Sequence, residues 1–92
     1  MRDEQRVTRS PDVLSRVLDG EAVLLDLGSG AYFGLNEVGT RAWELIGDGR
    51  TKRELRDALL QEFEVAPEKL DQDLDELLAS LEKRGLVRLE GL

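Results

Sequence analysis

The sequence predicts an α+β fold in which a three-stranded antiparallel β-meander is followed by three α-helices. Short β-compatible runs alternate with glycine-containing turns between residues 13 and 35. From residue 36 to 84, apolar residues recur at helical spacing and helix-capping signals separate them into three groups. No linker or internal repeat divides the chain, so we expect one domain over residues 1–92, with a core at about 11–89.

The first two strands are expected at Val13–Leu18 and Glu21–Leu27. Asp19-Gly20 joins them, and this pair tolerates the positive φ angles of a type I′ hairpin turn. A three-residue turn, Gly28-Ser29-Gly30, leads into a third strand at Ala31–Leu35. The expected order is a meander with the second strand in the middle and the third strand at one edge.

Loops of two and three residues fix the expected register. Leu14 then lies opposite Leu25, and Leu25 lies opposite Phe33. Because side chains alternate between the faces of a sheet, one face is expected to cover the helices and the other to be mixed. The set expected to cover the helices is Leu14, Val23, Leu25, Leu27, Phe33 and Leu35, and the mixed set is Ser15, Val17, Leu24, Asp26, Tyr32 and Gly34.

Capping signals mark the three expected helices. Asn36 is a suitable N-cap for the first helix, and Thr51 with Glu54 forms a capping box for the second, which is expected to end near Glu64. Pro67 suits the first turn of the third helix, and residues 86–89 are expected to form an extended tail. The apolar stripes are Val38, Ala42, Leu45 and Ile46, then Leu55, Ala58, Leu59 and Phe63, then Leu70, Leu74, Leu77, Leu78 and Leu81.

Composition excludes several classes of function. The chain has no Cys and no His, which removes disulfides, thiol nucleophiles, the usual zinc sites and the commonest general base, so we expect no enzymatic activity, metal or cofactor. The formal net charge of −7 repels nucleic acids and anionic membranes. The longest apolar runs span only four residues and residues 1–10 are charged throughout, so we expect neither a membrane span nor a signal peptide, but a cytoplasmic protein.

The third strand has an unprotected edge. Edge strands normally carry charges or proline that block pairing with other chains, yet Ala31–Leu35 has neither. The residues alone leave two explanations open. Either the chain's own termini or a second copy covers the edge, or a peptide partner adds a strand there.

Three helices with a small sheet also form winged helix-turn-helix domains, which commonly bind DNA. Here the third helix carries six acidic and three basic residues between 68 and 84, a charge of −3, which disfavours contact with phosphates. A DNA-binding transcriptional regulator is therefore the alternative function, and a self-associating structural domain is a third.

The segment 24–39, Leu-Leu-Asp-Leu-Gly-Ser-Gly-Ala-Tyr-Phe-Gly-Leu-Asn-Glu-Val-Gly, resembles the signature of the PqqD-like family. In that signature a leucine and an acidic residue precede a turn, an aromatic strand and a Leu-Asn helix start. The resemblance covers about residues 11–89 and continues at Trp43-Glu44-Leu45-Ile46, Asp48, Thr51, Glu54, Leu55, Val65, Pro67, Leu70, Asp73, Leu77, Leu78, Leu81, Gly85, Leu86 and Val87. The strand-turn segment departs from the founding branch in pyrroloquinoline quinone biosynthesis, which leaves the pathway open.

The resemblance implies a winged helix-turn-helix scaffold that binds the leader region of ribosomally made, post-translationally modified peptides without catalysis. It implies a modifying enzyme as partner, such as a radical-SAM maturase or a leader protease; the open edge is also compatible with a homodimer. It places the leader as an antiparallel strand beside the third strand, in the cleft next to the third helix. The implied peptide-binding residues are Ala31, Tyr32, Phe33, Gly34, Leu35, Leu70, Asp73, Leu74 and Leu77.

Overall fold

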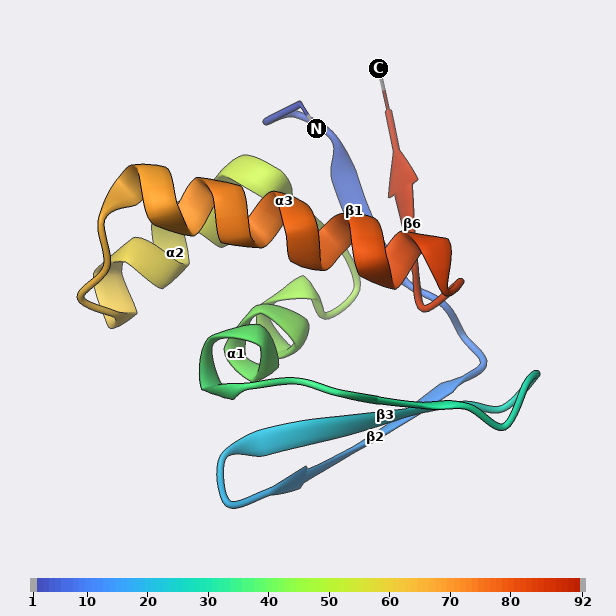
Figure 1. Ribbon diagram of the computed structural model, residues 1–92. Helices are drawn as coiled ribbons and strands as arrows, with labels where there is room; N and C mark the ends of the chain where they lie inside the picture. The colour runs from blue at the N-terminus through green and yellow to red at the C-terminus, as the bar shows by residue number, and fades with distance from the viewer. Residues whose placement is uncertain (1, 92) are drawn as a thin grey trace.

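The computed structural model describes residues 2–91, and Figure 1 shows α1 lying between a β-meander and the long helix α3, with a second small sheet near the C-terminal end of α3. In chain order the elements are β1 (Arg6–Arg9), β2 (Val13–Leu18), β3 (Glu21–Asp26), β4 (Tyr32–Gly34), α1 (Glu37–Ile46), β5 (Arg50–Thr51), α2 (Lys52–Glu62), α3 (Pro67–Lys83) and β6 (Val87–Glu90). The α+β class, the meander β2-β3-β4 and the three following helices are confirmed.

The local signals in the sequence lie where they were expected. Asn36 caps α1, and its side-chain oxygen accepts a hydrogen bond from the Gly39 amide at 2.8 Å. Thr51 and Glu54 form the capping box of α2, which ends two residues before the expected Glu64. Pro67 is the first residue of α3. None of the helices within residues 2–91 is long and apolar enough to cross a membrane.

A second sheet, with strand order β5-β1-β6, was not predicted. Its middle strand β1 lies in the charged N-terminal segment, before the residue 11 at which the core is expected to begin. The β1 strand pairs with β6 from Arg6↔Glu90 to Arg9↔Val87, and Val7 is completely buried. Within β1 only Val7 is strongly apolar, so the strand has no alternation that sequence reading could detect.

The register of β4 differs from the prediction by one residue. Leu14 lies opposite Leu25 as predicted, but Leu25 lies opposite Tyr32, and Leu24 lies opposite Phe33. The second loop therefore contains four residues, 27–30, instead of three.

Hydrogen bonds of Asp26 explain the longer loop. Its carboxylate accepts from the Gly28 amide at 3.0 Å and from the Ser29 hydroxyl at 2.9 Å, and its own amide donates to the Ala31 carbonyl at 2.9 Å. Because Asp26 and Ala31 form the last hydrogen-bonded pair between β3 and β4, Leu27 belongs to the turn.

The faces of the meander are also corrected. Ala22 and Leu24 are almost fully buried against the helices, whereas Leu24 was assigned to the mixed face. Phe33 and Leu35 do pack against the buried core, as predicted. The hairpin is apolar on both faces, so alternation alone could not select the buried one. The residues wrongly assigned to the buried face are Leu14, Val23, Leu25 and Leu27, of which Leu14 and Leu27 are more than half exposed.

A buried lysine joins α2, α3 and the N-terminal segment. The Lys52 side chain is 2% exposed, and its Nζ lies 3.0 Å from an Asp71 oxygen and 2.7 Å from an Asp75 oxygen. Burial acts to lower the pKa of Lys52, but the hydrogen bonds to Asp75 and Asp71 outweigh it and raise that pKa. The Lys52 amide also donates to the Gln5 carbonyl at 3.0 Å, which fixes the approach to β1.

One buried hydrogen bond connects the meander to α1. The Ala22 amide donates to the Thr40 hydroxyl at 2.7 Å, and that hydroxyl lies 3.5 Å from the Leu35 carbonyl. Thr40 is 4% exposed, so water cannot replace it as the partner of the Ala22 amide.

We predict that Thr40→Val lowers the free energy of unfolding by about 1–3 kcal/mol, because it leaves the Ala22 amide buried without an acceptor. Urea denaturation followed by circular dichroism measures this. Thr8→Val is the control, since the Thr8 hydroxyl makes a 3.3 Å hydrogen bond to Glu90 at an exposed position. Equal losses in the two variants would contradict the role assigned to Thr40.

Candidate peptide-binding groove

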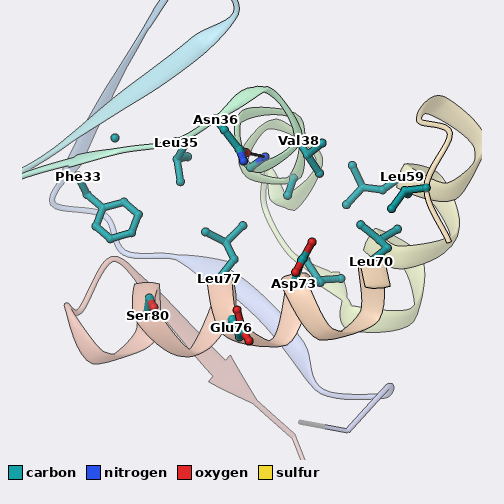
Figure 2. A pocket seen from close by; sticks show the side chains of 15 residues that line it. Phe33, Leu35, Asn36, Val38, Leu59, Leu70, Asp73, Glu76, Leu77 and Ser80 are labelled. Atoms are coloured by element: carbon teal, nitrogen blue, oxygen red, sulfur yellow. Dashed lines mark hydrogen bonds between the residues drawn. The ribbon is translucent and has the colours of Figure 1, made fainter. Parts of the chain in front are cut away.

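A groove of about 600 Å³ lies between β4 and α3, with α1 and α2 at one end. In Figure 2, Phe33 and Leu35 point into it from the strand side, and Leu77 and Asp73 point toward them from α3. Seven of the nine predicted residues line this groove, namely Phe33, Gly34, Leu35, Leu70, Asp73, Leu74 and Leu77.

The other two predicted residues lie beside a second cavity. Ala31 and Tyr32 line a space of about 260 Å³ next to the turn that precedes β4. Phe33 lines both cavities, so the second one continues the surface along β4. Tyr32 is 69% exposed and its side chain belongs to the outer face of the meander.

Helical spacing builds the wall formed by α3. Residues at intervals of three and four project from one side of a helix, which brings Leu70, Leu74 and Leu77 into one row. Leu70 and Leu74 are buried, Leu77 is half-buried, and Asp73 is exposed at the rim. The wall is therefore apolar at its base and charged at its edge.

Sequence reading missed the contribution of α1. Val38, Gly39 and Ala42 line the end of the groove because the Asn36 cap starts α1 directly after β4. A Cβ on Gly39 would come within 3.2 Å of the Asn36 Oδ1 atom, so a larger residue at this position would require the capping side chain to shift by a few tenths of an ångström. Nothing in the apolar stripe of the first helix distinguishes groove residues from core residues.

Other missed residues extend surfaces that were partly predicted. Leu59 and Val65 close the same end of the groove as α1. Glu76 and Ser80 lie three residues after Asp73 and Leu77 and share their side of α3. Continuing the helical spacing from Asp73 and Leu77 would have found Glu76 and Ser80.

The charged side chains on the groove wall are acidic. Asp73 and Glu76 are the charged residues that line it. Lys69 Nζ lies 2.9 Å from Asp73 Oδ1, and this hydrogen bond raises the pKa of Lys69. Both partners are exposed, so the pair remains accessible to solvent and is weak.

The backbone of β4 is unpaired on its outer side. The Leu35 amide donates to the Ala22 carbonyl at 2.8 Å, and the Ala31 carbonyl accepts from the Asp26 amide, so residues 31, 33 and 35 direct backbone groups toward β3. Alternate residues of an antiparallel strand direct these groups to opposite sides, which leaves those of Tyr32 and Gly34 at the open edge. Within residues 2–91 no strand pairs with that edge.

A family model and two solved structures relate the chain to known proteins. The family model for Coenzyme PQQ synthesis protein D (PqqD) matches residues 21–87. A solved structure, TbiB1 in complex with the TbiA(beta) leader peptide, is 36% identical with a TM-score of 0.77, and the match covers 92% of this chain and 96% of that one. A second, lasso peptide synthetase B1 complexed with the leader peptide, is 23% identical with a TM-score of 0.71 and shows the same fold over 89% of this chain and 96% of that one. No curated protein matches the chain.

The geometry of the edge predicts the order of amide exchange in the free protein. The Tyr32 and Gly34 amides point to solvent, so they should exchange with deuterium at least about tenfold faster than those of Phe33 and Leu35, which point to β3. Exchange followed by nuclear magnetic resonance measures the four rates. Slow exchange at Tyr32 and Gly34 would mean that another segment covers the edge.

Proposed function

Because the chain belongs to the PqqD family, we propose that it binds the leader region of a ribosomally made precursor peptide and presents it to a modifying enzyme. The observation that carries this proposal is the open edge of β4 beside an apolar groove. A peptide added as a strand obtains main-chain hydrogen bonds from the edge and side-chain pockets from the groove.

Each part of the site has a distinct role in this proposal. The backbone groups of Tyr32 and Gly34 hold the leader, and they do so for any sequence that can form a strand. Selectivity comes from leader side chains that face α3, where Leu70, Leu74 and Leu77 form an apolar wall. Side chains on the opposite face of the leader remain in solvent or contact the enzyme.

We further propose that the protein has no catalytic activity of its own and that a separate protein, such as a radical-SAM maturase or a leader protease, carries out the chemistry. The lack of Cys and His supports this, since the commonest nucleophile and general base are missing. Peptide recognition is favoured over the alternative of a DNA-binding regulator, because the 36%-identical structure is a complex with a leader peptide and because the net charge of −7 repels duplex DNA.

A binding measurement tests the function directly. The probe is the leader peptide of a precursor encoded beside this gene, and its scrambled sequence is the control. We expect fluorescence polarisation to show binding of the leader only, and mass spectrometry to show an unchanged precursor until the modifying enzyme is added. Equal affinity for the leader and the scrambled peptide would overturn the proposal.

We predict that Tyr32→Pro and Gly34→Pro each weaken leader binding about tenfold or more, because each removes an outward amide at the edge. The fold should survive, since proline is tolerated on edge strands and those amides have no partner in the free protein. Phe33→Pro should instead destabilise the sheet, because its amide points toward β3. Isothermal calorimetry and circular dichroism separate the two effects.

Ser15→Pro is the matched control on the opposite edge of the meander. The Asp12 carbonyl accepts from the Leu27 amide at 2.9 Å, so Ser15, three residues along the chain, directs its amide away from β3. This variant alters an outward amide far from the groove and should bind the leader normally. If Ser15→Pro weakened binding as much as Gly34→Pro, the leader would not be assigned to β4.

A further inference from the structure

The second cavity, beyond Phe33, differs from the main groove in charge. It lies between the turn at Asp26 and Ser29, the beginning of β4, and Arg84 just after α3. The charged residues that line the main groove, Asp73 and Glu76, are both acidic. The second cavity is lined by a cation, Arg84, together with the carboxylate of Asp26, so along the path of a strand beside β4 a positive charge is met only beyond Phe33.

Arg84 is held in place while its hydrogen-bond donors stay available. Its guanidinium carbon lies 4.9 Å from the centroid of the Phe33 ring, which is within the range of a cation–π interaction. The side chain is exposed, and no carboxylate in the described chain, residues 2–91, lies within 4.0 Å of its nitrogens.

The carboxylate that lines this cavity, Asp26, already accepts hydrogen bonds within the turn. Asp26 Oδ1 accepts from the Gly28 amide and Oδ2 accepts from the Ser29 hydroxyl, so both oxygens serve the turn. Arg84 is therefore the group in this cavity whose charge and donors are left for a ligand, and the ligand that fits a guanidinium is a carboxylate.

The register of an added strand determines which leader residue reaches Arg84. A strand antiparallel to β4 pairs its backbone with Gly34 and Tyr32, and its residue opposite Phe33 turns its side chain toward α3. Two residues further toward its C-terminus it lies opposite Ala31, with its side chain again on the helix side, at the second cavity. Residues bound in the main groove precede this position.

Resting on the proposed function, we propose that the second cavity binds the side-chain carboxylate of an Asp or Glu in the leader, and that Arg84 is the residue that selects it. This acidic residue follows the apolar leader residues that occupy the main groove. The two cavities then fix the direction of the leader, because a reversed strand would place its carboxylate beside Asp73 and Glu76.

Reciprocal substitution of charged residues in the protein and in the peptide tests the proposal. The probe is the leader peptide of the neighbouring precursor, amidated at its C-terminus so that no terminal carboxylate competes, with each Asp or Glu replaced by Lys in turn. We expect Arg84→Glu to weaken the unaltered leader about tenfold, and one Lys-substituted leader to bind this variant more tightly than it binds the wild-type protein. That Lys must lie after the apolar leader residues whose replacement by Ala costs most affinity.

Lys83→Glu is the matched control, because it makes the same change of charge one residue away, at an exposed position that lines neither cavity. We expect it to change affinity by less than about twofold, through screened long-range charge alone. Equal effects of the two variants, or no Lys-substituted leader that recovers binding to Arg84→Glu, would overturn the subsite while leaving leader binding intact. A wild-type protein that binds no leader would overturn the proposed function and the subsite together.

Discussion

The α1 end of the groove depends on the hydrogen bond between the Ala22 amide and the Thr40 hydroxyl. The β3–β4 ladder ends at Leu35, whose amide donates to the Ala22 carbonyl. The Ala22 amide has its acceptor on α1, the Thr40 hydroxyl, instead of on a strand. This holds the first turns of α1 against the buried face of the meander. Since α1 lines one end of the groove, the Thr40 hydroxyl fixes the position of that end relative to the meander.

Features that depend on a few neighbouring residues could be predicted from the sequence. The Asn36 cap, the Thr51–Glu54 capping box and Pro67 each involve contacts within one helical turn, and each starts a helix in the structure. The α3 wall of the groove could be predicted for the same reason, because helical spacing alone puts Leu70, Leu74 and Leu77 on one side.

Features that depend on distant residues or on a single side-chain contact could not be predicted. Two carboxylate hydrogen bonds of Asp26 lengthen the second loop by one residue, and that was enough to shift the register of β4. The β1 strand owes its existence to β6, some eighty residues later, and its own sequence contains too little apolar pattern to show it. The α1 end of the groove similarly requires knowledge of how α1 sits on the meander.

The β1–β6 pairing also determines where the polypeptide enters and leaves the domain. Arg6 lies opposite Glu90, and Figure 1 shows the beginning of β1 and the end of β6 on the same side of the molecule, away from β4. Material fused before β1 or after β6 would project from that side and leave the open edge of β4 uncovered. The topology therefore suits insertion of this domain into a larger polypeptide, with both connections made at one point and the open edge of β4 on a different side.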